Sequence, residues 1–358
     1  MDPYLIHQIC PSEGNPRNSE GAFLRAPNGE ILFAYSRYTG SSASDDAACD
    51  IALIRSTDNG RTFSEPEIIA RAAEFGTANI MSVSALPLLD GTLCFWFLIK
   101  EPDGTSTIGR TYSTDGKTFR AERCECLLPK CYYVINNDRM IRLADGRIAV
   151  PLAAHQMVFD REGHCKAFDN AATMFVAVSD DQGRSFCDTG ARVSLPPRIL
   201  GEPIWTQEPG IFERTDGAVI MWMRTNAGSQ YVCVSYDRMR SFTMPEPSEL
   251  TSPCSPLSML CHQGKIYAAY NPIPEYNGRC TEWGASRTPL VIRISEDAGR
   301  TWGPLNQIGE DPARGYCYAS MFAADDETML LSVCRGAINS GCLTETGIYR
   351  IPFAALRA

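Results

Sequence analysis

The sequence lacks the features that mark several common functional classes. No stretch approaches the roughly 18 consecutive apolar residues of a membrane-spanning helix, so no membrane association is expected. The start of the chain has no basic segment followed by an apolar run, so no signal peptide is expected. Basic residues are outnumbered by acidic ones, with a formal net charge of -9 over 358 residues. Because nucleic-acid binding depends on basic surfaces, a nucleic-acid partner is not expected either.

Metal-binding spacings are also lacking. The chain has 15 cysteines, but none form a Cys-x-x-Cys pair, and no His, Cys and Asp residues share zinc-ligand spacing. We therefore predict no metal and no cofactor. A disulfide framework is the alternative interpretation of so many cysteines. Buried, reduced thiols are the favoured one, and together with the missing signal peptide they predict a cytoplasmic protein.

A short pattern of the form Ser-x-Asp-x-Gly-x-Thr-aromatic recurs at intervals of about 60 residues. Its copies are 56–63, 113–119, 179–186, 235–242 and 295–302, of which the second is one residue shorter and the fourth has Met239 in place of the glycine. A repeat of this period indicates a radial or solenoid array, which behaves as one cooperative unit. The sequence thus predicts a single domain over residues 1–358.

Short apolar segments of strand length separate these boxes, and each repeat contains a tight-turn signal such as Asn28-Gly29 or Asp90-Gly91. Six such repeats predict an all-β fold, a six-bladed β-propeller with four-stranded antiparallel blades. The expected blades are 17–70, 77–125, 134–195, 205–250, 254–310 and 315–353. The last blade is one strand short, and the N-terminal segment 4–9 is predicted to supply that strand and close the ring.

The order of strands in a meander separates structural from functional residues. The tight turns and the boxes lie on the same face of such a propeller, so the box aspartates are predicted to bond the backbone N–H groups of their own turns. These aspartates are Asp58, Asp115, Asp181, Asp237 and Asp297.

The opposite face receives the starts of the innermost strands and the ends of the second strands. The strand starts are 17–20, 79–82, 136–139, 207–209, 255–256 and 316–320. The second strands end in Arg37, Lys100, His155, Arg224, Asn271 and Arg335. Polar groups converging on one mouth of a rigid ring predict a binding site. Within it, Asp138, Arg139 and His155 are candidate substrate contacts, with a turn and a core histidine as the alternatives.

The repeated boxes resemble the Asp-box repeats of the sialidase (neuraminidase) superfamily, over nearly the whole chain. Members of that family use three arginines for the substrate carboxylate, a Tyr nucleophile paired with a Glu, and an Asp acid/base. Residues that resemble these are Asp45, eleven residues before the first box, Glu208 with Arg224 at the next strand end, Arg287, Tyr318 in Tyr318-Ala319-Ser320, and Arg37. The resemblance implies a retaining glycoside hydrolase with a glycan partner, cleaving a terminal α-linked sialic acid or related acidic sugar.

This chemistry is physically consistent, because guanidinium groups bind a carboxylate with paired, charge-assisted hydrogen bonds. A neutral Tyr also suits an anomeric centre that already carries a carboxylate, with the paired Glu as its base. Asp45 would protonate the leaving oxygen and later deprotonate water.

Several assignments stay open at this point. Asp46 and Asp50 compete with Asp45, and strand alternation puts Tyr316 on the same side as Tyr318. The usual first arginine position holds Ser19, so Arg17, two residues earlier, is its candidate replacement. The alternatives to a sialidase are a glycosidase of this fold for another sugar and a non-catalytic glycan-binding propeller. Oligomeric state is not indicated.

Overall fold

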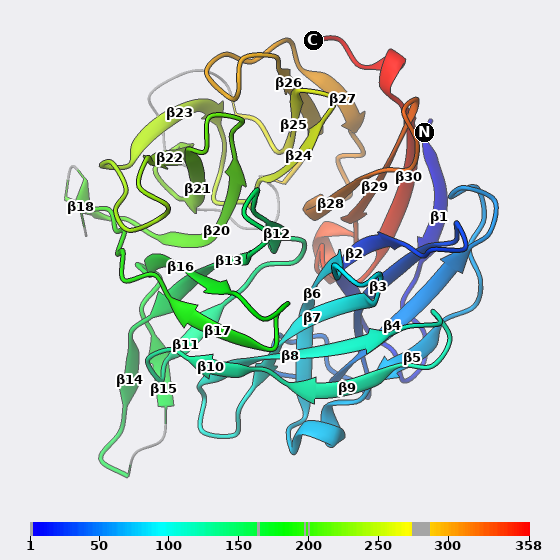
Figure 1. Cartoon of the computed structure of the whole chain (residues 1–358), viewed down its shortest axis with the longest axis horizontal. Helices are drawn as coiled ribbons and strands as arrows, with labels where there is room; N and C mark the ends of the chain where they lie inside the picture. The colour runs from blue at the N-terminus through cyan, green and yellow to red at the C-terminus, as the bar shows by residue number, and fades with distance from the viewer. Residues whose placement is uncertain (1–2, 163–164, 197, 200, 274–286) are drawn as a thin grey trace.

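The computed structural model describes residues 3–162, 165–196, 198–199, 201–273 and 287–358. These residues form an all-β fold with a β-propeller-like arrangement, in which antiparallel sheets stand around a common centre (Figure 1). Three short 3-10 helices are the only helices of this described part, at Ala72–Phe75 (η1), Ile338–Ser340 (η2) and Phe353–Ala355 (η3).

The first half of the chain supplies three groups of strands. The first group is β2 (Asn18–Arg25), β3 (Ile31–Tyr38), β4 (Cys49–Ser56) and β5 (Glu67–Ala70). The second is β6 (Asn79–Pro87), β7 (Leu93–Lys100), β8 (Ser106–Ser113) and β9 (Arg120–Arg123). The third is β10 (Glu125–Leu127), β11 (Tyr132–Val134), β12 (Ile141–Arg142), β13 (Ile148–His155), β16 (Thr173–Ser179) and β17 (Ser185–Asp188). A parallel contact between Cys49 and Asn79 joins the first two groups into one sheet.

The second half supplies three four-stranded sheets. They are β20 (Thr206–Glu213), β21 (Val219–Thr225), β22 (Ser229–Ser235) and β23 (Glu246–Thr251); then β24 (Ser258–His262), β25 (Lys265–Tyr270), β26 (Leu290–Ser295) and β27 (Asn306–Gly309); and last β28 (Cys317–Ala323), β29 (Thr328–Cys334), β30 (Thr346–Pro352) and β1 (Leu5–Ile9). Two small hairpins lie outside these sheets, β14 (Met157–Phe159) with β15 (Cys165–Phe168) and β18 (Arg198–Ile199) with β19 (Glu202–Pro203).

The two ends of the chain meet in the last sheet. Strand β1 pairs antiparallel with β30, with Gln8 opposite Gly347. Hydrophobic clusters fill the spaces between neighbouring sheets, and one of them joins Phe33 and Ile54 of the first sheet to Leu330 and Ile348 of the last. The first and last sheets are therefore direct neighbours, as Figure 1 shows.

The Asp-box turns are structural, as the sequence predicts. In the last box, Asp297 Oδ1 accepts the backbone N–H groups of Arg300 and Thr301 at 3.0 and 2.9 Å, and Oδ2 accepts the Thr301 hydroxyl at 2.6 Å. Hydrogen bonds from the Thr301 side chain and backbone lower the pKa of Asp297 to about 2. The other four boxes make the same kind of contacts around Asp58, Asp115, Asp181 and Asp237.

One box turn also packs directly on the neighbouring sheet. The fully buried Trp96 of β7 donates its indole N–H to the carbonyl oxygen of Gly183 at 3.1 Å. A Cβ on Gly183 would lie 2.4 Å from the Trp96 ring, and the glycine has a φ of +77°. Glycine is required here both for its conformation and for the close approach of the indole.

We expect Gly183→Ala to destabilise the protein by about 1–3 kcal/mol more than Gly146→Ala, because the added methyl overpacks the site around Trp96. Gly146 is the matched control, since it has a φ of +89° but no atom within 4 Å of its added Cβ. Urea unfolding of both variants measures the difference. Equal losses would show that the turn does not depend on the contact with Trp96.

Candidate active site

The inner strands share a backbone distortion that builds the site. At or next to the starts of these strands, five residues other than glycine have a left-handed φ between 47° and 62°, and they are Glu20, Ser82, Asp138, Glu208 and Tyr318. In four of the strands the pairing register shifts at this residue, as in a β-bulge. Such conformations cost about 1–3 kcal/mol each and are concentrated at functional sites. Each bulge breaks the simple alternation of side chains near the centre of the propeller-like ring.

This distortion corrects the prediction that Tyr316 and Tyr318 face the same side. Tyr316 is fully buried, and its ring packs on Gly309 in the core between two sheets. Tyr318, with a φ of 55°, lies in a central cavity instead. The register shift between Cys317 and Ser320 is the reason that alternation fails here.

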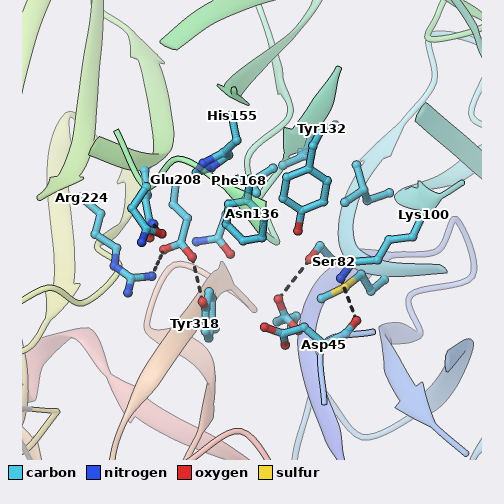
Figure 2. Close-up of a pocket in the computed structure, with 17 residues that line it drawn as sticks. Asp45, Ser82, Lys100, Tyr132, Asn136, His155, Phe168, Glu208, Arg224 and Tyr318 are labelled. Atoms are coloured by element: carbon cyan, nitrogen blue, oxygen red, sulfur yellow. Dashed lines mark hydrogen bonds and ion pairs between the residues drawn. The ribbon is translucent and has the colours of Figure 1, made fainter. Parts of the chain in front are cut away.

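The central cavity has a volume of about 170 Å³ and receives residues from most of the sheets. Figure 2 shows Glu208, Arg224 and Tyr318 on one side of it and Asp45, Ser82 and Lys100 on the other, with Asn136 between them and His155 and Tyr132 above. The predicted residues that line it are Asp45, His155, Glu208, Arg224 and Tyr318.

Glu208 is the centre of the first group. Its Oε1 accepts the Tyr318 hydroxyl at 2.7 Å, and its Oε2 lies 2.8 Å from Arg224 Nη1 (Figure 2). Glu208 and Arg224 are 7% and 1% exposed, so this ion pair is buried. A phenol that donates to a buried carboxylate has the geometry of a nucleophile with its base.

The charges of this group are strongly coupled. Burial alone would raise the pKa of Glu208, but the charge of Arg224 and hydrogen bonds from Arg224 and Tyr318 outweigh it, so the pKa is lowered. Burial and the nearby Glu208 carboxylate raise the pKa of Tyr318 well above its usual value. The resting site thus contains an ionised carboxylate and a neutral phenol.

Asp45 faces this group from the loop after β3. Its side chain is 63% exposed, and Arg17 Nη1 donates to its Oδ1. Partial desolvation by the surrounding protein would raise the pKa of Asp45, but the charge and hydrogen bond of Arg17 outweigh it and the pKa is lowered. The two competing aspartates have other contacts: Asp46 binds Lys100 Nζ at 2.9 Å, and Asp50 accepts the backbone N–H of Ala72 at the start of η1.

Glu20 lines the cavity but was not singled out as a site residue from the sequence. Its Oε1 accepts the Ser82 hydroxyl at 3.0 Å, and its Oε2 accepts the Ser19 hydroxyl at 2.9 Å and Arg17 Nη2 at 2.7 Å. Burial is the main cause of its raised pKa. The sequence pointed to Glu20 only through its position in the polar strand start 17–20.

An aromatic wall completes the cavity. His155 and Tyr132 have ring centroids 5.8 Å apart, and Phe168 lies 5.3 Å from His155 and 4.9 Å from Tyr132. His155 Nδ1 lies 2.6 Å from the Asp169 carbonyl oxygen, so Nδ1 carries the proton. Burial lowers the pKa of His155. Tyr132 and Phe168 were missed because they come from irregular connections, β11 and the β14–β15 hairpin.

Arg287 borders a second cavity of about 350 Å³, which shares Asp45 and Tyr318 with the first. Its guanidinium carbon lies 5.8 Å from the Tyr318 ring centroid. Its Nη1 lies 3.2 and 3.3 Å from the sulfur atoms of Cys317 and Cys342. Arg287 is therefore beside the proposed nucleophile and contacts thiols rather than a carboxylate there.

Besides Arg287, four predicted binding residues do not line the central cavity. Arg37 shares a face of β3 with Tyr35, which packs toward the last sheet. Asp138 accepts the Ser320 hydroxyl at 2.8 Å, and Arg139 turns to Ser258 and the Leu257 carbonyl at 3.1 and 2.6 Å. Burial lowers the pKa of Arg139 to about 10.

The fourth is Arg17, which the sequence offered as a replacement for the displaced arginine. It is 2% exposed and lies behind Glu20 and Asp45, contacting both. The prediction that Arg17 contacts the substrate is thus not supported by its position, because carboxylates of the protein already occupy its guanidinium.

Within the described ranges, no three or more His, Cys, Asp or Glu side chains are grouped so that they could hold a metal ion. In the same part of the chain, no helix has the length and apolar character needed to cross a membrane.

Comparison with known proteins identifies the family. Residues 39–331 match the model of the BNR repeat-like domain. This match covers most of the chain, and the chain therefore belongs to the BNR repeat-like family, within the sialidase superfamily.

A sialidase from Bacteroides fragilis (strain YCH46) is 24% identical over 360 residues, covering 92% of this chain and 60% of that protein. The chain thus spans about three fifths of the length of that curated relative. The Hadza microbial sialidase Hz136 superimposes with a TM-score of 0.72 at 16% identity, over 96% of this chain and 67% of that one. The intramolecular trans-sialidase from Ruminococcus gnavus, in complex with oseltamivir carboxylate, has a TM-score of 0.69 at 13% identity, over 99% and 98%. At these sequence identities, the similarity to the solved structures shows a shared fold.

We expect Arg224→Met to destabilise the protein by about 3–5 kcal/mol at neutral pH, because it leaves the buried Glu208 carboxylate without its counter-charge. The loss should shrink as the pH falls, since protonation of Glu208 removes the unpaired charge. Chemical unfolding across pH measures both effects.

The double variant Arg224→Met/Glu208→Gln is the control, and it should recover part of the lost stability. A double variant no more stable than Arg224→Met would contradict this account of the pair.

Proposed function

We propose that the protein is a retaining glycosidase that releases a terminal α-linked, carboxylate-bearing sugar, as an exo-α-sialidase does. The observation that carries the proposal is the 2.7 Å hydrogen bond from Tyr318 to Glu208, in a cavity that Asp45 also lines. A candidate nucleophile, its base and an acid thus line one cavity.

The reaction would follow two steps. Tyr318 attacks the anomeric carbon and gives its proton to Glu208, while Asp45 protonates the departing glycosidic oxygen. Water then attacks the same carbon and gives a proton to Asp45, and Tyr318 leaves with the proton held by Glu208. Two displacements at one carbon retain its configuration.

The pKa directions support these roles in part. Glu208 is ionised in the resting site and can accept the phenolic proton, which Tyr318 holds firmly until attack. Asp45 is held ionised by Arg17, so as an acid it would work best at low pH, with its activity falling as the pH rises through its lowered pKa.

The substrate carboxylate would bind on the Tyr318 side of the cavity. Arg224 and Arg287 are both buried and lie beside Tyr318, which interacts electrostatically with both of them. A carboxylate there would be close to two guanidinium groups from different sheets. The aromatic wall of Tyr132, His155 and Phe168 offers a less polar surface for the rest of the sugar.

A second candidate is a glycosidase of the same fold for another sugar. The observation that favours it is the engagement of Arg17 by Glu20 and Asp45, which keeps Arg17 from binding a substrate carboxylate beside Tyr318.

We also propose that the ring has six blades and is closed by β1. The pairing of β1 with β30 and the cluster between the first and last sheets support this. A cytoplasmic location is proposed as well, supported by the free thiols of the described cysteines.

The direct test is hydrolysis of a fluorogenic α-sialoside by the purified protein. We expect turnover by the wild type, a loss of about 10²–10⁴-fold in Asp45→Ala, and at least as large a loss in Tyr318→Phe. Tyr318→Phe removes one oxygen atom from the cavity, so its unfolding curve should stay close to that of the wild type.

No turnover by the folded wild type would overturn the sialidase proposal. A panel of fluorogenic glycosides of neutral and other acidic sugars would then test the second candidate, and inactivity on all of them would leave a binding propeller.

A further inference from the structure

We propose that Arg17 is a positioning residue that aims the Asp45 carboxylate into the cavity, and that Glu20 fixes Arg17 from the opposite side. Arg17 would then make no bond to the substrate carboxylate. This inference rests on the proposed glycosidase function and assigns a role in it to two residues, Arg17 and Glu20.

Most N–H groups of the Arg17 guanidinium already donate hydrogen bonds to protein groups. Nε donates to Ser19 Oγ at 2.9 Å, Nη1 to the Ala43 carbonyl and Asp45, and Nη2 to Glu20 Oε2 at 2.7 Å. These bonds use four of the five N–H groups that an arginine has. A bidentate bond to a substrate carboxylate needs two free donors on one edge, so Arg17 would have to give up a contact to make it.

Packing also holds Arg17 in place. The Tyr38 ring lies 4.3 Å from the guanidinium carbon, and the side chain is 2% exposed. Glu20 is fixed in turn by its left-handed backbone and by hydrogen bonds from Ser19 and Ser82. Arg17 is therefore a rigid donor that is set before any substrate arrives.

Asp45 is the exposed end of this arrangement. Its side chain is 63% exposed, and Arg17 makes the only side-chain hydrogen bond to its carboxylate in the described part of the chain. Its backbone carbonyl is held separately by Lys100 Nζ at 2.8 Å and Asn79 Nδ2 at 3.0 Å. Arg17 thus sets the direction of the carboxylate, while Lys100 and Asn79 hold the backbone.

The charges favour the same division of roles. Arg17 faces two carboxylates, so it offers no net positive charge to a third one. Glu20 lines the cavity at this end and would repel a substrate carboxylate. Such a carboxylate would therefore be directed to the opposite end, beside Arg224 and Arg287, and donors such as sugar hydroxyls would face Glu20.

The charged and titratable groups that act on Asp45 come from several elements. They are Arg17 just before β2, Glu20 of β2, Tyr38 of β3, Lys100 of β7, Tyr132 of β11 and Arg287 before β26. Arg17 makes the largest lowering contribution to the pKa of Asp45. Its removal should raise that pKa and move the alkaline limb of the pH–rate profile to higher pH, because the acid then keeps its proton longer.

The first experiment measures hydrogen exchange of residues 39–48 in the wild type and in Arg17→Lys, Glu20→Gln and Asp45→Asn. We expect faster exchange of this segment in all three variants. Arg139→Lys is the matched control, since Arg139 is also 2% exposed but contacts Ser258 and Leu257 instead. Asp45→Asn changes an exposed side chain and so tests the contact even if the buried variants fold poorly.

The second experiment separates positioning from binding. A dehydro sialic acid, which carries the carboxylate but cannot be cleaved, is titrated into each variant by calorimetry. Arg17→Lys should change its Kd less than about threefold, whereas Arg224→Lys should weaken it by about tenfold or more. With a cleaved sialoside, Arg17→Lys should lower kcat with little change in KM, whereas Arg17→Gln, which removes the charge, should also shift the alkaline limb upward.

Unchanged exchange at 39–48 in Arg17→Lys, Glu20→Gln and Asp45→Asn would overturn the inference, as would a loss of sugar-acid binding in Arg17→Lys equal to that in Arg224→Lys. If the dehydro sialic acid does not bind, the hydrogen-exchange result alone tests whether Arg17 positions Asp45. A wild type that hydrolyses no glycoside but shows the exchange effect would overturn the proposed function and leave the contact standing.

Discussion

The left-handed residue near the start of the inner strands is the constraint on which the site depends. In regular strands, the side chains of Glu20, Glu208 and Tyr318 would point into the spaces between neighbouring sheets. They would then not meet in the central cavity. The bulge costs about 1–3 kcal/mol at each position, a cost that the packing of the surrounding sheets must offset. It brings a carboxylate, a hydroxyl or a phenol from different sheets to one cavity.

Buried charge is tolerated in this cavity because it is arranged in pairs. Glu208 is compensated by Arg224, and Arg17 by Glu20 and Asp45, so two groups of charges face each other across the space. The two groups differ in character. One combines a buried ion pair with a phenol, and the other ends in an exposed carboxylate on a loop. In the proposed mechanism, the first group would carry the covalent step and the second the proton transfer.

Much of the scaffold could be predicted from the sequence, because the Asp-boxes recur with a regular period and have a known turn chemistry. Asp297 and its equivalents bond their own turns as expected. The N-terminal segment pairs in the last sheet as expected too, since β1 lies beside β30. In the site, Glu208, Arg224, His155 and Tyr318 line the cavity because they lie at the strand starts and strand ends that the repeat locates.

The remaining part of the site depends on features without a sequence pattern. A left-handed glutamate or tyrosine has no residue signature, unlike glycine, so alternation gave the wrong side for Tyr316. Tyr132 and Phe168 come from a short strand and a side hairpin that interrupt the repeat. Arg17 and Arg139 are ionisable residues at strand starts, but they contact protein groups rather than the cavity, which only packing between sheets determines.

The central claim is that Tyr318 forms a covalent bond to the sugar. It is tested most directly by incubating the protein with a 3-fluoro sialosyl fluoride, which forms the glycosyl–enzyme species and slows its hydrolysis, and then sequencing the modified peptide by mass spectrometry. The account predicts one sugar attached at Tyr318 and none in Tyr318→Phe. A sugar attached to Asp45 or Glu208, or no attachment while the protein turns over a sialoside, would contradict it.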